Sequence, residues 1–380
     1  MNTGTALSKS LHQRHLMIVI HSLSGGGAER VAADLSAYWV ERGYKVSVVT
    51  QTDATDDAYV LHPQVQRFAL GTAATSTGAI SGVLANLRRV RLLRRLIKKQ
   101  RPTVVLGMMT TASVLAIVAA RGLRCRVIAT EHTHPPSQEL SSMWLRLRRW
   151  AYPQASKVVA LTSGTSAWLD EHVPGCRLAV IPNAVRWPLQ NTEPVLVPPE
   201  KGERRRLLAA GRLHPHKGFD LLVRAFEMVA HFFPDWDLVI LGEGDCRESL
   251  QQQIDEAGLA SRVSLPGRVG NISDWYAQSD LYVLSSRVEG LSNTLIEAMA
   301  SGVAPVAFDC ETGPREIVRN GIDGVLVNPA EDVEALAAHL SDMMAHEIQR
   351  QAYAKRAVDV RDRFSVTRVM TLWRQVFEDR

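Results

Sequence analysis

Two glutamates eight positions apart, Glu289 and Glu297, form the pair in this sequence whose spacing most clearly suggests chemistry. The apolar run 281–284 before them is expected to be a strand, and Ser292 or Asn293 is a good cap for a following helix. The first N–H groups of such a helix can hold a phosphate. Glu297 would lie about one turn into the helix. A carboxylate there can accept hydrogen bonds from two adjacent hydroxyls, such as a ribose diol.

Arg212 and Lys217 bring two cations into the loop after another apolar run, 207–210. Arg212 directly follows Gly211, and Lys217 directly precedes Gly218. Arg212 offers a planar fork of donors and Lys217 a point charge, and two such cations suit a diphosphate. The alternative is a pair of ordinary surface charges, which is the default for any single arginine or lysine.

Three successive glycines, 25–27, follow the apolar run 16–20 and precede a helical stretch expected at 31–42. They expose backbone N–H groups where a helix begins, and that end of a helix favours an anion. The alternative is a tight strand-to-helix turn. The GxGxxG spacing of a dinucleotide site and the Gly-Lys-Ser/Thr of a P-loop are both missing, which disfavours a Rossmann oxidoreductase.

The elements that must position these loops are short apolar runs, each followed by a helical stretch. Continuous rather than alternating apolar runs suit parallel strands that are covered on both faces. Strands alternating with helices imply an α/β architecture. The runs are 16–20, 46–50, 104–108, 127–130, 158–161, 207–210, 238–241, 263–265, 281–284 and 304–307.

The stretch 186–206 breaks this rhythm with four prolines and a charged run, and we interpret it as an interdomain linker. Two doubly wound domains facing each other would be joined there. The uncharged stretch 102–120 is expected to be a buried strand and a buried helix rather than a membrane span, which needs about 20 dominantly apolar residues. No secretory signal is visible in the polar residues 1–15.

Composition excludes several classes of protein. Hydrophobic residues make up 46% and charged residues 22%, which is ordinary for a globular chain and excludes whole-chain disorder. The four cysteines are widely scattered without a CxxC, so neither a disulfide framework nor a structural zinc site is expected. Asp235 and Asp237 form one Asp-x-Asp that a metal-dependent transferase would use. We interpret it as a turn, because it precedes the strand 238–241 instead of following it.

The two glutamates, the Arg212–Lys217 loop and the glycine-rich loop together resemble glycosyltransferase family 4. The resemblance covers residues from about 16 to 375. It implies retaining, nucleotide-sugar-dependent transfer and the GT-B fold, an α/β fold of two facing Rossmann-like domains. The implied boundaries are an acceptor-binding domain at 1–185, the linker at 186–206, a donor-binding domain at 207–361, and a C-terminal helix at 362–380 that crosses back to the first domain.

The resemblance also implies roles for single residues. Glu297 would bind the ribose hydroxyls and Glu289 the transferred sugar's hydroxyls near C3 or C4. Arg268 and Val269 match the segment whose backbone holds the nucleobase. His132 matches a histidine that lies beside the reacting sugar, with a helix-capping loop histidine as the alternative. The diphosphate-binding set comprises Gly26, Arg212, Lys217, Ser292, Asn293 and Thr294.

The sequence departs from the family pattern at two places, one in the diphosphate-binding set and one in the stretch after the strand 127–130. Ser292 stands where many members have proline, and 131–134 lacks the common His-Asp pair. Glu131 is a candidate for a different acceptor contact, and the exact acceptor role stays open. By the same resemblance, the expected donor is a UDP-sugar, with GDP-mannose as the alternative. The acceptor implied by the resemblance is a lipid-linked or surface glycan, joined by an α-linkage in polysaccharide or glycoconjugate biosynthesis.

No metal ion or other cofactor is expected, because cations and helix N–H groups at the phosphate can stabilise its departure. One alternative function is a GT-B-like nucleotide-sugar epimerase or hydrolase. A scaffold with a decayed site is the non-enzyme alternative. It predicts the loss of Arg212, Lys217 or the glutamates, which are all present.

The charges divide unevenly between the halves of the chain. Residues 1–190 hold 23 Lys and Arg against 10 Asp and Glu, a net +13, whereas 191–380 hold 21 against 29, a net −8. The stretch 88–101 holds eight cations and no acid, and 144–150 adds two tryptophans. If the stretch 88–101 is helical, one apolar stripe runs along it, made of Leu87, Val90, Leu93 and Ile97.

This pattern suits a cytoplasmic protein that binds peripherally to the inner face of an anionic cell membrane. One alternative is a helix packed on the sheet with a solvated basic face. Nucleic acid is not an expected partner, because no recognition motif accompanies the charges.

Overall fold

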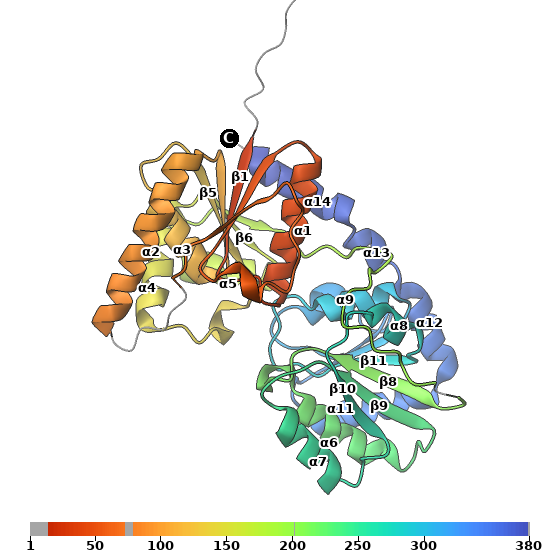
Figure 1. Ribbon diagram of the computed structural model, residues 1–380. Helices are drawn as coiled ribbons and strands as arrows, with labels where there is room; N and C mark the ends of the chain where they lie inside the picture. The colour runs from red at the N-terminus through yellow and green to blue at the C-terminus, as the bar shows by residue number, and fades with distance from the viewer. Residues whose placement is uncertain (1–13, 73–78, 201, 379–380) are drawn as a thin grey trace, which may run out of the picture. The chain divides into compact units, whose positions relative to one another are not determined.

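The computed structural model describes residues 14–72, 79–200 and 202–378, which form two compact units. The first unit comprises Met1–Leu161, Thr165–Val180 and Val376–Arg380, and the second comprises Thr162–Gly164 and Ile181–Gln375. Each unit contains one sheet in which every strand pairing is parallel. The expected α/β architecture with two doubly wound sheets is confirmed (Figure 1).

The first unit holds a seven-stranded sheet in the order β3-β2-β1-β4-β5-β6-β7. Its strands are β1 (His15–Val19), β2 (Lys45–Thr50), β3 (Gln66–Ala69), β4 (Val104–Met108), β5 (Arg126–Glu131), β6 (Lys157–Ala160) and β7 (Leu178–Val180). Its helices are α1 (Gly27–Glu41), α2 (Ala79–Gln100), α3 (Thr110–Ala120), α4 (Ser142–Ala151) and α5 (Ser163–His172). Three short 3₁₀ helices are η1 (Ala54–Asp56), η2 (Pro135–Ser137) and η3 (Tyr152–Gln154).

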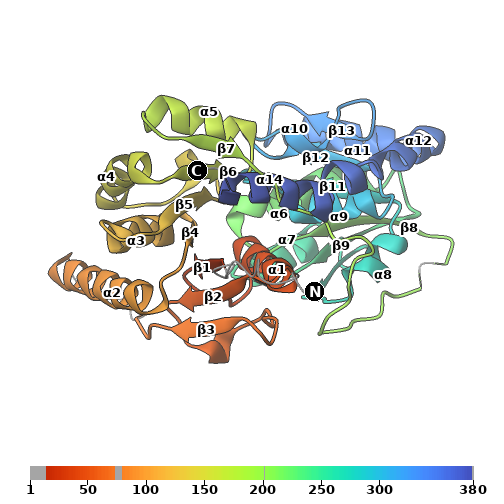
Figure 2. The same cartoon turned by 90° about the horizontal axis from the view of Figure 1, so that it is seen from above.

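Helices α2, α3 and α4 cover the same face of this sheet (Figures 1 and 2). Their apolar side chains share one buried cluster with alternate residues of the central strands, including Leu93 and Ile97 of α2. Helix α1 covers the opposite face, where Trp39 packs on Phe377 with ring centroids 5.1 Å apart. The stretch 102–120 forms β4 and α3, as expected. In the part of the chain that the structure describes, no helix is long and apolar enough to cross a bilayer.

The second unit holds a six-stranded sheet in the order β10-β9-β8-β11-β12-β13. Its strands are β8 (Arg205–Ala210), β9 (Trp236–Leu241), β10 (Val263–Gly267), β11 (Leu281–Leu284), β12 (Pro305–Phe308) and β13 (Val325–Val327). Its helices are η4 (Pro215–Lys217), α6 (Phe219–Ala230), α7 (Arg247–Glu256), α8 (Ile272–Ala277), α9 (Asn293–Ala300), α10 (Pro314–Ile317), α11 (Val333–Ala345), α12 (Glu347–Ala357) and α13 (Val360–Arg363). The final helix, α14 (Val366–Glu378), begins in this unit and ends in the first.

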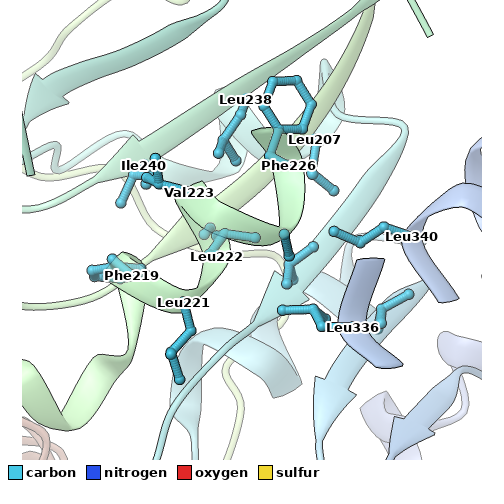
Figure 3. Close-up of a cluster of buried hydrophobic side chains, with 14 of the residues drawn as sticks. Leu207, Phe219, Leu221, Leu222, Val223, Phe226, Leu238, Ile240, Leu336 and Leu340 are labelled. Carbon is cyan, nitrogen blue, oxygen red and sulfur yellow. The ribbon is translucent and has the colours of Figure 1, made fainter. Parts of the chain in front are cut away.

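The core of the second unit lies between the sheet and helices α6 and α11. Phe226 of α6, Leu336 and Leu340 of α11, Leu207 of β8 and Leu238 of β9 belong to one buried cluster of apolar side chains (Figure 3). Burying such large apolar side chains contributes roughly 1.5–3 kcal/mol each, before the entropic cost of ordering them. This packing gives the loops at the strand ends a rigid base.

The division between the units falls at Ile181, before the predicted linker 186–206 begins. The second half of that stretch is held by the second unit. Asn271 bonds both the amide and the carbonyl of Leu196 at 3.0 Å, and the Trp275 indole donates to the same carbonyl. Residues 205 and 206 already belong to β8. Proline content signalled the break in the α/β rhythm but not this anchoring.

The order of the strands reverses once in each sheet, between β1 and β4 and between β8 and β11. In open α/β sheets, ligands bind beyond the carboxyl ends of the strands at such a switch point. The loops that follow these four strands are therefore where a site is expected in each unit.

Candidate functional site

The switch point of the second unit brings Lys217 and Glu289 together. Lys217 ends the loop after β8, and its Nζ donates to Oε1 of Glu289, in the loop after β11, over 2.6 Å. Ser286 donates a second hydrogen bond to the same Oε1 over 2.7 Å. The Glu289 side chain is only 7% exposed, so this carboxylate is buried and directly paired.

Backbone geometry makes this approach of the two loops possible. Gly218 has φ +61°, and a Cβ at that position would overlap the carbonyl oxygen of Ser285. The Ser285 hydroxyl donates to the Lys217 carbonyl over 3.0 Å. Gly313, with φ +101°, packs on the backbone of Gly290. These two glycines therefore let the loops after β8, β11 and β12 lie against each other at the carboxyl edge of the sheet.

Both hydrogen bonds that the structure describes for the Glu289 carboxylate fall on Oε1. Its other oxygen, Oε2, therefore keeps its acceptor capacity for a ligand hydroxyl. Burial raises the pKa of the Cys310 thiol to about 12, and the nearby charge of Glu289 adds to that shift. Glu289 is thus a fixed negative charge inside the carboxyl edge.

Helix α9 begins directly after this loop. Ser292 occupies the N-cap position but makes no capping hydrogen bond with its side chain. Its hydroxyl lies 3.3 Å from that of Thr294, which in turn accepts from the Tyr282 hydroxyl over 2.8 Å. The expected capping by Ser292 is therefore not what fixes the helix start; the bonds made by Thr294 do so. The first backbone N–H groups of α9 have no acceptor within the helix and face the loop.

Glu297 lies in the same helix and is 4% exposed. Burial raises the pKa of the Tyr282 hydroxyl, and the charges of Glu289 and Glu297 raise it further. Both carboxylates therefore act on one tyrosine of β11. The two glutamates that the sequence singled out lie on the same side of the switch point.

The other predicted donor residues stand further apart. Arg212 is exposed in the loop after β8, where Gly242 permits the loop after β9 to approach Gly211. Arg268 is exposed and Val269 half-buried after β10, which β9 separates from β8. The structure thus joins Lys217 directly to Glu289. It leaves Arg212 exposed in the loop of Lys217 and places Arg268 two strands away from that loop.

In the first unit, Gly26 lies at the N-cap of α1, beyond the carboxyl end of β1. The carboxylate of Glu29 occupies the space that a Cβ at position 26 would need. The helix thus begins at Gly27, four residues before the expected start, and a carboxylate of its own first turn lies at the helix end.

His132 directly follows β5 at the carboxyl edge of the first sheet. Both of its ring nitrogens are buried, and neither has a hydrogen-bond partner among the described residues. Burial lowers its pKa to about 4, so the ring is neutral at pH 7. A neutral imidazole offers one donor and one acceptor, and both remain for a ligand. A helix-capping role, the alternative from the sequence, would require one of these nitrogens to be bonded.

Glu131 does not carry the acceptor contact expected from the sequence. Its side chain is 1% exposed, and its carboxylate accepts from Thr110 and Gln138 over 2.9 Å and from the Tyr152 hydroxyl. Arg148 lies 3.9 Å away. β5 extends through Glu131, so this side chain points into the interior, where it ties α3, α4 and the intervening loop together.

Asp235 and Asp237 lie at the opposite, amino edge of the second sheet. Asp237 forms a two-pronged ion pair with Arg204, with both N–O distances 2.5 Å. Asp235 lies 3.8 Å from Arg205. These contacts connect the start of β8 with β9 at the amino edge of the sheet, whereas Lys217 and Glu289 lie at its carboxyl edge. Within the described ranges, no group of three or more His, Cys, Asp or Glu side chains is placed to hold a metal ion.

Sequence reasoning missed several residues that shape this site. Ser286 bonds the same oxygen of Glu289 as Lys217 does, and Thr312 bonds the Glu289 carbonyl over 2.8 Å. The Ser285-Ser286 pair ends a predicted strand, which is the signal that could have indicated Ser286. Thr312 lies 23 residues after Glu289 in the sequence, and only the pairing of β11 with β12 brings the two residues together.

Two family models match the chain. Residues 25–186 match the model described as Glycosyltransferase Family 4. Residues 197–360 match the model described as Glycosyl transferases group 1. Each match falls largely on one of the two structural units.

Similar curated proteins include bacterial enzymes of glycan assembly. The exopolysaccharide phosphotransferase of Streptomyces coelicolor is 32% identical over 275 residues, which are 72% of this chain and 28% of that protein. The amylovoran biosynthesis glycosyltransferase AmsD of Erwinia amylovora is 27% identical over 90% of this chain and 93% of its own length. The GalNAc-alpha-(1->4)-GalNAc-alpha-(1->3)-diNAcBac-PP-undecaprenol alpha-1,4-N-acetyl-D-galactosaminyltransferase of Campylobacter jejuni is 23% identical over 94% and 96%.

Solved structures of similar fold include two further proteins. Sucrose-phosphate synthase from Thermosynechococcus elongatus superposes with a TM-score of 0.83 at 18% identity, over 96% of this chain and 99% of that one. HepE of Anabaena, in complex with UDP and glucose, superposes with a TM-score of 0.79 at 20% identity, over the same shares. At this level of identity the likeness shows the fold.

Proposed function

We propose a specific reaction for this chain, which belongs to glycosyltransferase family 4 and has the GT-B fold. It moves a sugar from a UDP-sugar to a lipid-linked or surface-glycan acceptor, with retention at the anomeric carbon and therefore an α-linkage. The product enters a bacterial polysaccharide or glycoconjugate. The observation that carries this proposal is the Lys217–Glu289 pair at the switch point, beside the start of α9.

The leaving group requires positive charge in that place. As the bond to the anomeric carbon breaks, negative charge grows on the leaving diphosphate. Fixed cations and helix N–H groups stabilise such charge without reorganising. Lys217, Arg212 and the backbone of Ser292, Asn293 and Thr294 supply them, and Gly26 is the remaining member of the proposed diphosphate-binding set. With these groups present, the reaction proceeds without a metal ion.

Glu289 has a different task. Oε1 holds Lys217 and Ser286, and Oε2 accepts from hydroxyls of the transferred sugar near C3 or C4. Glu297 accepts from the ribose diol of the nucleotide, and the backbone at Arg268 and Val269 contacts the base. His132, neutral and without a partner among the described residues, lies beside the reacting sugar and bonds one of its hydroxyls.

A UDP-sugar donor and a lipid-linked acceptor are supported by the names of related proteins. HepE was solved with UDP and glucose, and the Campylobacter jejuni relative is named for a PP-undecaprenol acceptor. The AmsD relative is named for the biosynthesis of amylovoran. An acceptor of this kind presents its reacting hydroxyl at a bilayer, whereas the nucleotide sugar is dissolved in the cytosol.

The surface formed by α2 and α4 is proposed to lie on the inner face of an anionic membrane. Leu93 and Ile97, half of the apolar stripe expected from the sequence, are buried in the core, so that stripe is not what meets lipid. Other apolar side chains on the same two helices are exposed, including Leu84 at 61% and Trp150 at 45%. Exposed cations surround them: Arg88, Arg91, Arg95, Lys98, Lys99, Arg146 and Arg149.

A flotation assay tests this surface. Binding to vesicles with anionic lipid should fall on raising the salt and on replacing Arg91 and Arg95 by glutamate, because each cation near such a surface contributes about 1 kcal/mol. Arg94 is unsuitable for the test, since it donates to the carbonyls of Ala119 and Arg121 over 2.8 and 2.7 Å and supports the end of α3. Absence of binding to anionic vesicles at low salt would contradict the proposal.

The reaction itself is tested by incubating the protein with UDP-sugars and polyprenyl-diphosphate-linked glycans. We expect product only when both substrates are present, with the small anomeric proton coupling of an α-linkage in its NMR spectrum. Rapid turnover of the UDP-sugar without acceptor would instead favour an epimerase or a hydrolase. A β-linked product would exclude retention.

A further inference from the structure

The side chain of Arg287 contacts the loop that carries Lys217 on both sides of that lysine. Its guanidinium donates to the Pro215 carbonyl over 2.8 Å, two residues before Lys217. It also forms a two-pronged ion pair with Asp220, three residues after Lys217, over 2.7 and 2.6 Å. Asp220 lies in the first turn of α6. The guanidinium therefore spans the turn in which Lys217 lies.

The backbone of Arg287 strengthens this connection. Its amide donates to the His216 carbonyl over 2.8 Å, next to Lys217. Arg287 stands two residues before Glu289, in the loop after β11. Its Nε makes a second ion pair with Glu331, which follows β13, over 3.0 Å. One arginine thus joins loops from three strands at the carboxyl edge of the sheet.

This arrangement matters because lysine is a flexible ligand. Its four-carbon stem loses conformational entropy when the charge is fixed in one place. The loop around Lys217 also begins at Gly211 and ends at Gly218, which adds backbone freedom. A loop that was already held before the donor arrived would bind the diphosphate at a smaller entropic cost.

We infer that Arg287 is a positioning residue that holds Lys217 opposite Glu289, with Asp220 as its anchor. The ion pair of Arg287 with Asp220 would thereby set the affinity for the nucleotide diphosphate. The inference rests on the proposed donor role of Lys217. Only arginine can hold Asp220 with two parallel bonds while also reaching a carbonyl and a second carboxylate. Neither Arg287 nor Asp220 need touch the donor.

The test measures UDP binding by calorimetry and the KM for the UDP-sugar in Arg287→Ala, Asp220→Asn and the double variant. Each single change should weaken UDP binding and raise the donor KM about tenfold with little change in kcat, and the double variant should add little more. Arg287→Lys, which keeps a charge opposite Asp220, should recover part of the loss. It also serves as the test variant should Arg287→Ala not fold.

A matched control lies at the other edge of the same sheet. Arg204 pairs with Asp237 in the same two-pronged geometry, far from the loops of Lys217 and Glu289. Arg204→Ala should change the melting temperature comparably and leave UDP binding unaltered. A purely structural role for Arg287 predicts the same behaviour for both arginines, and that result would overturn the inference.

Lys217→Ala separates failure of this inference from failure of the proposed function. If Lys217→Ala weakens UDP binding but a folded Arg287→Ala does not, the positioning role is wrong and the donor site stands. If neither variant changes UDP binding, the donor role of the loop is wrong. Additive effects of Arg287→Ala and Asp220→Asn would also contradict the inference, since the two residues would then act independently.

Discussion

Lys217 and Glu289 are 72 residues apart in the sequence, yet the Nζ of one lies 2.6 Å from Oε1 of the other. They meet because β8 and β11 are neighbours at the point where the strand order reverses. A cation and a carboxylate placed there can bind different parts of one substrate. The lysine suits the departing phosphate, and the carboxylate suits the hydroxyls of the sugar.

Replacing Glu289 by glutamine should reduce turnover by about 100-fold or more, because a buried charge that orients the sugar and Lys217 is lost. The melting temperature should change little, since glutamine fills the same space and the residue lies in a loop. Transfer assays and thermal unfolding measure the two quantities. Glu248→Gln, at an exposed position on α7, is the control and should behave as the wild type. Unimpaired turnover of Glu289→Gln would remove the carboxylate from the mechanism.

Glu131 should matter for stability, because its carboxylate holds Tyr152, Thr110 and Gln138 in the interior. Glu131→Ala leaves these donors and Arg148 without their acceptor, and breaking such a buried network costs about 3–5 kcal/mol of unfolding free energy. Urea denaturation measures it. Glu139→Ala, at an exposed position eight residues on, should stay within about 0.5 kcal/mol of the wild type. Equal stability of the two variants would mean that the network contributes nothing.

His132 should make the free energy of unfolding depend on pH. Its pKa in the folded protein is lowered to about 4, whereas the unfolded chain has an ordinary value near 6.5. The unfolded state therefore binds a proton first, so stability is complete above pH 6.5 and falls as the pH drops from 6.5 towards 4. The loss amounts to about 3 kcal/mol.

The comparison of wild type with His132→Phe isolates this effect, because phenylalanine cannot titrate. The difference in unfolding free energy between the two proteins should change with pH from 7 to 4.5, to the disadvantage of the wild type at the acid end. A difference that stays constant across this range would show that the ring is not buried as a neutral group.

Sugar transfer should continue at full rate in excess EDTA, because in the proposed mechanism Lys217, Arg212 and the start of α9 neutralise the leaving group. The rate is measured before and after dialysis against the chelator, and again after adding Mg²⁺ or Mn²⁺. Strict dependence on either ion would contradict this assignment. Because Arg204 already holds Asp237, such dependence would direct attention to acidic groups elsewhere.

The sequence predicted the parallel strands well where they are continuous apolar runs, as in β1, β4 and β8. It did not indicate β3, whose side chains are partly or fully exposed at all four positions, nor β7 and β13, which have three residues each. Such strands bury too little apolar surface to leave a pattern, and only pairing with a longer neighbour defines them.

Individual site residues could be named from loops and spacing, but their contacts could not. Nothing local to Lys217 indicates Glu289 or Arg287 as a neighbour, because these contacts depend on which strands pair. Glu131 was misinterpreted for the same reason. It stands at the end of an apolar run like a loop residue, yet Tyr152 and Gln138 fold over it and enclose it.

The central claim is that Lys217 neutralises the departing diphosphate. The most direct measurement is the rate of sugar transfer by Lys217→Ala at saturating UDP-sugar, with Lys355→Ala at an exposed position of α12 as the control. We expect the Lys217 variant to fold and to lose about 100-fold or more of its turnover, or about 3 kcal/mol of transition-state stabilisation. Lys355→Ala should turn over at the wild-type rate. Near-wild-type transfer by Lys217→Ala at saturating donor would contradict the account.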